Sequence, residues 1–563
     1  MRSKSILWGA LLGGLTSLPV IALYYLGEQF AGLPFLPFDL FDWLARSLPG
    51  DVVTAGIDAL VALITALDVG PTSDVAKTIE QLTGIALVVA GGVLLGALTV
   101  WLARRLPWPA WQVGGAVGTL LFLIALALVI DLGVLEPVVA AVLWLALLNT
   151  GWGALLGQLL VVVAAVPARE PDAAEAPRAD VDAARRAALL KIAGGSAVVT
   201  LGAWAVGRLF AGQEAGSGAG QPLAGLPTPE APVPAPGATA TPLPSAGNGS
   251  GSGGTPVPEP TAGVTVRDRV PPAPGTRPEL TANEDFYRID INTRPVVIDG
   301  ESWVLQVDGL FDSPRPLTIE DLMAYPAVTQ PITLSCISNR VAGDLIGTSN
   351  WTGVRLRDVL KDLGLRPGAR ELYIEAADGF YESVAMEDMM DPRTLLVYAM
   401  NGETLPVEHG YPLRIYIPDR YGMKQPKWIT RIEAIDEQGP GYWVERGWSE
   451  EARPHIVSVI DAVALERSPD GTLAVGGIAW AGDRGIQKVE VQVDGGEWVA
   501  AALRTPPLSP LTWVQWRYDW PAEPGRHTLT VRATDGTGAL QIEERSTPHP
   551  SGATGYHSLD VNV

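Results

Sequence analysis

Hydrophobic residues are spread unevenly along the chain, because long apolar runs fill the first 210 residues and are absent from the rest. A helix needs about 20 mainly apolar residues to cross the hydrocarbon core of a bilayer. Five runs approach or exceed this length, at residues 6–26, 85–102, 113–130, 134–166 and 192–210. We therefore predict an α-helical transmembrane region over residues 1–211, with about five crossings.

The apolar stretch at residues 52–67 is ambiguous, because it is short and Asp51, Asp58 and Asp68 punctuate it. If it crossed the membrane, Arg104 and Arg105 would face outward, against the rule that basic residues stay on the cytoplasmic side. If it lies on the outer surface as an amphipathic helix, the basic residues at the ends of the crossings all face the cytoplasm. We therefore predict a multi-pass protein of the cell membrane with its later part on the extracytoplasmic side; six crossings are the alternative.

Glycine, proline, alanine, serine and threonine dominate residues 212–282. A segment of this composition cannot bury enough apolar surface to fold by itself, so we predict a disordered linker. A flexible chain of this length has a typical reach of about 45 Å. The part that follows is therefore predicted to be tethered and mobile.

Strand and helix patterns mix in the next region, residues 283–450. Residues 303–307 and 372–376 have strand patterns, and residues 318–323 have a helical one. Because strands and helices do not alternate regularly, we predict an α+β domain.

The last region, residues 451–563, has short strands at regular spacing. Residues 488–494 and 527–535 alternate strictly between apolar and polar positions, and Asp494-Gly-Gly supplies a hairpin turn before Trp498. This pattern predicts a β-sandwich.

Composition argues against several classes of partner and of metal site. The formal net charge of -21 over 563 residues argues against a nucleic-acid partner. The single cysteine excludes an intramolecular disulfide and any zinc or iron–sulfur site that needs several thiolates. The first histidine is His409, so no predicted membrane helix can supply histidine ligands to a haem.

The single cysteine, Cys336, follows an apolar strand pattern that ends at residues 333–335. Residues 354–363 then read as an amphipathic helix, which predicts that the thiol lies on a glycine-bearing loop between a strand and a helix. A lone cysteine is most often a small buried hydrophobic residue, and that is the alternative interpretation.

The residues around the thiol resemble a known family. The run Cys336-Ile-Ser-Asn339-Arg340, followed by Gly343-Asp-Leu-Ile-Gly and Trp351-Thr-Gly-Val, is similar to the segment of sulfite oxidase-type molybdopterin enzymes in which a cysteine thiolate ligates molybdenum. The similarity is strongest to the bacterial branch that includes the periplasmic protein-methionine-sulfoxide reductase catalytic subunit. It implies molybdenum and molybdopterin as cofactors, Cys336 as the metal ligand, Ser335 and Asn339 near the cofactor, and Arg340 as a catalytic cation.

A second set of residues concentrates positive charge in an acidic chain. His409, Arg414, Lys424 and Lys427 fall within a short stretch, and arginine with lysine suits a phosphate or pyrophosphate group. A solvated basic face is the alternative. The ordered match to the family's His-Gly-Tyr/Phe-Pro-x-Arg and Gly-x-Lys-x-x-Lys-Trp segments implies that these residues and Gly422 hold the pterin and its phosphate.

Two further segments resemble family motifs. The run that opens the domain at Asn283 resembles the family's entry to the pterin pocket, which implies cofactor contacts from Asn283, Phe286, Tyr287 and Arg288. Tyr398, in Tyr-x-Met-Asn-Gly, resembles a tyrosine that lies near the metal-bound oxo groups and is therefore a catalytic candidate; a core tyrosine is the alternative. Some sulfite oxidases carry a second arginine where this chain has Val341, which leaves the substrate open.

The remaining resemblances concern assembly and export. Residues 451–563 resemble the immunoglobulin-like domain that serves dimerisation in sulfite oxidases, which implies a homodimer. Arg185-Arg186 resembles a twin-arginine export signal, and an ordinary basic flank is the alternative.

Together these features predict a membrane-anchored, extracytoplasmic molybdenum oxidoreductase. It would transfer an oxygen atom, either oxidising sulfite or reducing a sulfoxide or related S- or N-oxide, and exchange electrons with a cytochrome or membrane redox partner. The alternative is a tethered binding module that keeps the fold without the metal. A transporter is disfavoured, because the apolar runs contain no evident intramembrane ionic site.

Overall fold

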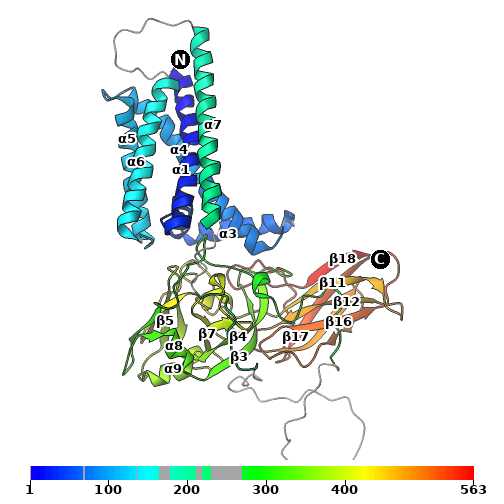
Figure 1. Ribbon diagram of the computed structural model, residues 1–563. Coiled ribbons are helices and arrows are strands. Elements are labelled where there is room, and N and C mark those ends of the chain that lie inside the picture. Colours follow the sequence, from blue (N-terminus) through cyan, green and yellow to red (C-terminus); the bar gives the residue numbers. More distant parts are fainter. Residues whose placement is uncertain (1, 68–69, 136, 164–177, 211–217, 230–268) are drawn as a thin grey trace, which may run out of the picture. The chain divides into compact units, whose positions relative to one another are not determined.

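The computed structural model describes residues 2–67, 70–135, 137–163, 178–210, 218–229 and 269–563, and these form two compact units (Figure 1). One unit is helical and the other is built mainly of β-sheets. The helices are α1 (Arg2–Ala31), α2 (Leu36–Ser47), α3 (Gly50–Leu67), α4 (Thr72–Ala103), α5 (Ala110–Asp131), α6 (Val138–Val163) and α7 (Arg178–Phe210).

Five helices are long and apolar enough to cross a membrane, as the sequence predicts. They span Ser5–Ala31, Thr72–Ala103, Ala110–Asp131, Val138–Val161 and Arg186–Leu209. The ambiguous stretch forms α3, which is not among them. The short helix α2, which the sequence analysis did not predict, comes between α1 and α3.

Pairs of glycines four residues apart let these helices approach closely. A Cβ on Gly13 of α1 would lie 2.0 Å from the carbonyl oxygen of Gly92 on α4, and one on Gly96 would lie 2.1 Å from that of Gly9. Small residues at this spacing are typical of helices that pack inside a bilayer. The same arrangement joins α5 and α6, which run side by side in Figure 1, through Gly114, Gly118, Gly153 and Gly157.

Residues Asp290–Arg294 belong to the helical unit, which corrects the predicted domain of residues 283–450. The backbone N–H of Thr293 donates to Asp42 of α2 (2.9 Å), and Arg294 forms an ion pair with Asp39 of the same helix (3.3 Å). The partners lie about 250 residues apart in sequence, so no local pattern could have shown this contact.

Two five-stranded sheets build the first part of the other unit and confirm its α+β character. The first has the order β2 (Leu317–Thr318), β1 (Val304–Gly309), β10 (Ile429–Ile435), β5 (Glu371–Ala376) and β6 (Tyr381–Ala385). The second has the order β3 (Ala327–Ser335), β4 (Ile346–Arg355), β7 (Leu395–Met400) and β8 (Glu403–Thr404), with β9 (Arg414–Tyr416) on β7. Helices α8 (Ile319–Met323), α9 (Leu356–Asp362) and α10 (Met386–Met389) complete it.

One apolar core includes residues of both sheets and the short helices. It contains Leu305 and Ile432 from the first sheet, Leu396 from the second and Leu360 from α9, all fully buried. The predicted helix at 354–363 is shorter than expected, because β4 continues to Arg355. Cys336 therefore lies on the loop between the antiparallel strands β3 and β4, and not between a strand and a helix.

Two four-stranded antiparallel sheets form the C-terminal part. They have the orders β11 (Val457–Arg467), β12 (Leu473–Trp480), β16 (Val514–Trp520), β15 (Ala502–Leu503) and β14 (Trp498–Ala500), β13 (Ile486–Val493), β17 (Arg526–Asp535), β18 (His557–Asn562). Val475, Trp516, Val491 and Val531 share one core. The predicted turn at Asp494 joins β13 to β14 with two residues in the left-handed region.

The described parts of the predicted linker, residues 218–229 and 269–282, pack on the sheet unit, so the prediction of a disordered linker over residues 212–282 is wrong for these parts. Residues 218–223 pair with β8 and the residues that flank it: the N–H of Gly220 donates to Leu405 (3.3 Å), that of Leu223 donates to Gly402 (3.0 Å), and that of Thr404 donates to Gln221 (2.8 Å). Composition missed this because the partner segment supplies the backbone hydrogen bonds. The rest of the predicted linker, residues 212–217 and 230–268, lies outside the described residues.

We expect hydrogen exchange to detect this added strand. A peptide covering residues 218–226 should retain at least two slowly exchanging amides, because Gly220 and Leu223 donate to backbone carbonyls. Thr404→Ala should speed that exchange, because the Thr404 hydroxyl bonds Gly218 (2.7 Å) and the Gln221 amide (2.9 Å). Complete exchange of the wild-type peptide within seconds would contradict the packing.

Candidate active site

The loop that carries Cys336 is held by backbone hydrogen bonds and one amide side chain. The N–H of Cys336 donates to Leu345 (3.0 Å), and the carbonyl of Cys336 accepts from Asn339 (3.1 Å). The Asn339 side chain then accepts from the N–H of Leu345 (3.1 Å). The Ser335 hydroxyl is directed at the Leu345 carbonyl as well (3.4 Å). Ser335 and Asn339, both predicted cofactor ligands, therefore shape the loop.

Gly343 is required for this loop to close. A Cβ at this position would lie only 2.3 Å from the Asn339 side-chain oxygen. The preceding Ala342 has φ of 65°, in the left-handed region that L-residues rarely adopt. The glycine at position 343 of the family-like segment is thus explained by the lack of space for a Cβ beside Asn339.

The thiol itself is 8% exposed and lies 3.0 Å from the Ser338 hydroxyl. Burial raises the pKa of Cys336, and the hydrogen bond from Ser338 offsets this only in part. The thiolate therefore needs a cation to stabilise it. Among the described residues, no group of three or more histidine, cysteine or acidic side chains could hold a metal.

Two tyrosines lie near the thiol. A charge on Cys336 raises the pKa of both Tyr287 and Tyr421, in each case after the larger effect of burial. The Tyr421 hydroxyl accepts from the N–H of His455 (3.1 Å), and its pKa rises to about 12. Both therefore stay protonated and can donate a hydrogen bond. Tyr287 was predicted; Tyr421 and Ser338 were missed, although both stand inside the motifs that the sequence analysis used.

Tyr398 lies elsewhere than predicted. It is the bulged residue of β7, since Thr352 and Gly353 pair with Ala399 and Val397. Its side chain belongs to the apolar core that includes both sheets, with Leu396 and Ala399, and burial raises its pKa. The structure therefore supports the alternative of a core tyrosine, and Tyr287 and Tyr421 replace Tyr398 beside the thiol.

A buried cation defines the other side of the site. Arg414 is 5% exposed; it donates to the carbonyl of His409 (3.1 Å) and stacks on Trp351 (4.7 Å). Burial lowers its pKa to about 10, and no carboxylate among the described residues forms an ion pair with it. A buried charge without a counter-ion is costly. Arg414 is therefore suited to receive an anion.

His409 lies among cations and stays neutral. Burial, together with the charges of the neighbouring Lys427, Arg414 and Arg288, lowers its pKa to about 3. Its Nε2 lies 3.1 Å from the carbonyl of Asn283 and must carry the proton, because a carbonyl can only accept. His409 is thus a fixed hydrogen-bond donor at the centre of a cationic cluster made of Arg288, Arg414 and Lys427.

Aromatic side chains connect this cationic cluster to the thiol. Phe286 stacks on Tyr287 (ring centroids 5.3 Å apart) and meets His409 edge-on (5.4 Å). A Cβ on Gly422 would lie 3.2 Å from the Tyr287 hydroxyl and 3.5 Å from the carbonyl of Ser335, the residue before Cys336. On the other side, Phe286 lies 5.5 Å from Trp351, the ring on which Arg414 stacks. Cys336, Tyr287, Arg414 and His409 therefore form one continuous site.

Two glycines allow the close packing that this site requires. A Cβ on Gly422 would lie 3.2 Å from the Tyr287 hydroxyl. Gly410 has φ of 108°, and a Cβ there would lie 3.0 Å from Lys427 and 3.2 Å from Arg414. The cationic side chains can approach one another only because these positions lack side chains.

The predicted site residues that remain have structural partners. The Asn283 side chain donates to Glu403 (3.2 Å) and accepts from Asn401 (3.0 Å). Lys427 donates to the carbonyl of Glu408 (2.9 Å). Arg340 lies half-buried on the Cys336 loop.

Lys424 differs from its predicted role as a phosphate ligand. Its Nζ pairs with Glu382 at 2.8 Å, and both side chains are almost fully buried. Burial raises the pKa of Glu382 to about 7, although the charge of Lys424 opposes this. Because Glu382 already compensates its charge, Lys424 has a structural role in this ion pair. Glu382 lies on β6, far away in sequence, and could not be recognised as its partner.

Comparisons with known proteins agree with this geometry. The oxidoreductase molybdopterin binding domain family matches residues 292–443. Sulfite oxidase of Arabidopsis thaliana is 30% identical over 280 residues, which cover 40% of this chain and 71% of that protein. The uncharacterized oxidoreductase YuiH of Bacillus subtilis is 33% identical over 171 residues, which cover 30% and 84%.

The chain belongs to the sulfite oxidase-type molybdopterin oxidoreductase family. It is a molybdenum oxidoreductase whose cofactor is molybdopterin. Among solved structures, the sulfane dehydrogenase SoxCD from Paracoccus pantotrophus matches with a TM-score of 0.46 and 24% identity, covering 51% of this chain and 82% of that one.

The site of this sulfite oxidase-type chain fits the cofactor. A single thiol suits a metal whose other ligands come from an organic group. A buried guanidinium without a carboxylate among the described residues suits the phosphate of that group. Tyr287 links the two.

We expect two buried arginines to respond differently to substitution. Arg414→Met should leave the cofactor-free protein as stable as before and reduce retained pterin more than tenfold, because no buried carboxylate loses its partner. Arg393→Met is the matched control: it removes the partner of Asp391 (2.7 Å) and Asp483 (3.0 Å) and should lower the unfolding free energy by about 3 kcal/mol. Thermal unfolding and pterin fluorescence measure both; a large destabilisation by Arg414→Met would contradict the uncompensated charge.

The low pKa of His409 predicts a pH dependence of stability. Between pH 6.5 and 3 the unfolded chain binds a proton that folded His409 does not, so stability falls as the pH drops below 6.5. By pH 5 the loss should reach about 2 kcal/mol. In urea unfolding followed by tryptophan fluorescence, His409→Gln should reduce the difference between pH 7 and pH 5 by this amount.

His527→Gln is the control for that experiment. Its side-chain hydrogen bond with Asp494 raises the pKa of His527, so its stabilising contribution is present below the usual pKa and is lost as the pH rises. This variant should therefore not reduce the loss of stability in acid. An unchanged pH difference in His409→Gln would show that His409 does not cause it.

Proposed function

We propose that this chain is a membrane-anchored oxidoreductase that transfers an oxygen atom between water and a sulfur substrate outside the cytoplasm. The observation that carries the proposal is the packed path from one buried thiol, Cys336, to one buried cation, Arg414, through the aromatic side chains of Tyr287 and Phe286. Cys336 would ligate molybdenum. Arg414, together with Lys427 and Arg288, would hold the phosphate of the pterin.

When bound, the molybdenum centre supplies oxygen-atom transfer coupled to a two-electron change. Sulfite oxidation takes an oxygen atom from water and releases two electrons and two protons. Sulfoxide reduction consumes two electrons and two protons and releases water. The Arabidopsis relative supports sulfite as the substrate. Val341, where some sulfite oxidases have arginine, leaves sulfoxides and other S- or N-oxides as the second class.

The chain's own residues near the thiol are suited to bind an oxyanion. Tyr287 and Tyr421 carry hydroxyl groups that stay protonated, and Arg340 extends from the same loop as Cys336. Hydrogen-bond donors and a cation orient a sulfur oxyanion or a sulfoxide oxygen toward the reacting centre. Ser338 can hold or accept the proton of the thiol at Sγ (3.0 Å).

The helical unit supports the membrane anchor. Large apolar side chains such as Leu94, Val139 and Leu143 are mostly exposed on helices long enough to span a bilayer. The basic residues Arg104 and Arg105 follow α4 and would lie in the cytoplasm with the N-terminus. The end of α7 then reaches the outer side, with the catalytic unit after it; Arg185-Arg186 would act as an internal twin-arginine signal.

Electrons would pass to or from a separate partner. All five histidines lie at or after His409, and the single cysteine is the proposed metal ligand. A cytochrome or a membrane carrier is therefore the proposed partner. The C-terminal sheets would correspond to the immunoglobulin-like domain of the family and form a homodimer.

The test is metal and pterin content together with activity. Wild-type protein from a host that makes molybdopterin should hold about one molybdenum per chain and turn over sulfite or methionine sulfoxide. Cys336→Ser should abolish turnover while the fold persists, because serine is a poor ligand for a metal that needs a soft thiolate. Ser338→Ala is the matched control and should keep the metal.

Two outcomes would overturn the proposal. Metal-free and pterin-free wild-type protein from a competent host would favour the binding module. Full activity of Cys336→Ser with bound molybdenum would remove the thiol from the mechanism.

A further inference from the structure

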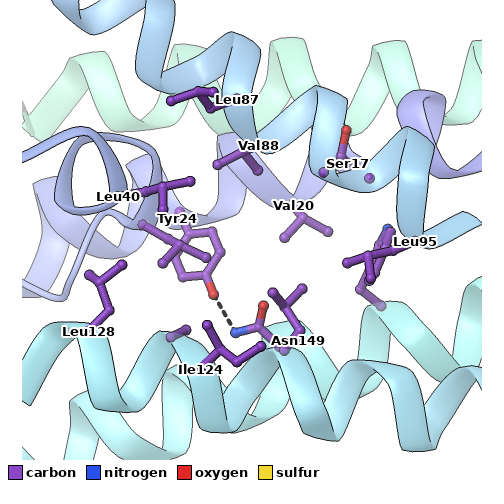
Figure 2. Close-up of a pocket in the computed structure, with 16 residues that line it drawn as sticks. Ser17, Val20, Tyr24, Leu40, Leu87, Val88, Leu95, Ile124, Leu128 and Asn149 are labelled. Carbon is purple, nitrogen blue, oxygen red and sulfur yellow. Dashed lines mark hydrogen bonds between the residues drawn. The ribbon is translucent and has the colours of Figure 1, made fainter. Parts of the chain in front are cut away.

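The helical unit contains a pocket that the proposed catalysis does not use. It lies among α1, α2, α4, α5 and α6 and has a cavity volume of about 120 Å³, part of it open to the outside (Figure 2). This volume approaches the roughly 150 Å³ of an apolar cavity that binds a single aromatic ring. Because the surrounding helices are the membrane-spanning candidates, a ligand would enter from the lipid and must itself be lipid-soluble.

The wall of the pocket is apolar and uncharged. None of its lining residues is acidic or basic, and most are aliphatic, among them Val20, Leu40, Val88, Ile124 and Leu128. A phosphate or a carboxylate would find no counter-ion here. The head group of the ligand is therefore neutral.

One polar pair faces this pocket with unused hydrogen-bonding capacity. Tyr24 and Asn149 line it and are 0% and 2% exposed. The Asn149 amide nitrogen donates to the Tyr24 hydroxyl (2.7 Å) and to the carbonyl of Leu145 (2.8 Å), which uses both of its protons. Among the described residues, nothing pairs with the Tyr24 hydroxyl proton or the Asn149 oxygen.

The other polar groups of the wall are already satisfied. The Ser17 hydroxyl donates to the carbonyl of Gly14 (2.8 Å), and the Trp152 ring nitrogen donates to Thr16 (3.0 Å). The pocket thus offers one neutral donor and one neutral acceptor at a single place (Figure 2). A plain hydrocarbon chain would leave both without a partner, at a cost for each buried polar group.

We propose that this pocket binds the head group of an isoprenoid quinone or its quinol. The quinone carbonyl accepts the proton of Tyr24, the quinol hydroxyl donates to the oxygen of Asn149, and the isoprenoid tail leaves through the open side into lipid. The claim concerns binding alone, so it stands or falls independently of the proposed catalysis.

Two variants test the polar pair and the space. Tyr24→Phe removes the donor while Asn149 keeps its bond to Leu145. Gly91→Leu adds apolar bulk at the wall of the pocket, because Gly91 lines the pocket and has room for a Cβ, which would meet nothing within 4 Å. Tyr25→Phe and Gly151→Leu are matched controls, since neither residue lines the pocket and Gly151 also has open space around it.

The experiment measures saturable binding of decylubiquinone to the full chain in phosphatidylcholine nanodiscs, by extraction and chromatography of the retained probe. Wild type and both controls should bind about one molecule per chain. Tyr24→Phe should weaken binding about three- to tenfold, the effect of one hydrogen bond. Gly91→Leu should weaken it more than tenfold. Molybdenum content should not change in any variant.

Three outcomes would overturn the inference: non-saturable retention in wild type, equal affinity in all five proteins, or a phospholipid found in the pocket by native mass spectrometry that decylubiquinone does not displace. Loss of binding in the controls as well would assign the effect to general damage and also contradict a specific pocket.

Discussion

The catalytic part of the structure depends on the strand β3 being fixed along both edges. One edge pairs with β4 from Ala327 to Ser335. The other edge is bonded by the loop between β15 and β16: the N–H of Thr333 donates to Leu511 (3.0 Å), and the Ser509 hydroxyl donates to Pro331 (2.6 Å). Cys336 follows directly after this doubly bonded strand, so its thiol has little freedom to move. This loop of the C-terminal part therefore supports the active site within a single chain, whatever part the C-terminal sheets play in assembly.

The buried cations of the scaffold have carboxylate partners, whereas the buried cation of the proposed site has none among the described residues. Lys424 and Arg393 are buried beside Glu382 and beside Asp391 and Asp483, so their charges serve the fold. Arg414 is equally buried and has no such partner among the described residues. Because all three are cationic and buried, residue type and burial alone would not distinguish them. Only the position of the carboxylates does, and Glu382 and Asp483 come from parts of the chain far from the cations that they pair with.

This explains what the sequence could and could not predict. The five long apolar helices, the α+β domain and the strands β13 and β17 follow from local periodicity. Cys336, Tyr287 and Arg414 were proposed from motifs. For Tyr398 the structure favours the alternative of a core tyrosine, because a β-bulge decides which core its side chain enters. The backbone pairing of residues 218–223 and the place of Arg294 were missed because their partners are nearly 200 or more residues away in sequence. Composition describes only what a segment can do alone.

The site at Arg414 and the pocket at Tyr24 and Asn149 were recognised by the same criterion, although the free-energy cost of the missing partner differs between them. A buried group that could form another hydrogen bond or ion pair, and does not, indicates a ligand. For Arg414 the missing partner is a charge, whose burial costs several kcal/mol, so the site must be stabilised by dense packing and strongly favours an anion. For Tyr24 and Asn149 the missing partners are neutral hydrogen bonds, worth about 1 kcal/mol each. Such a pocket can stand empty at little cost, and its ligand can come and go.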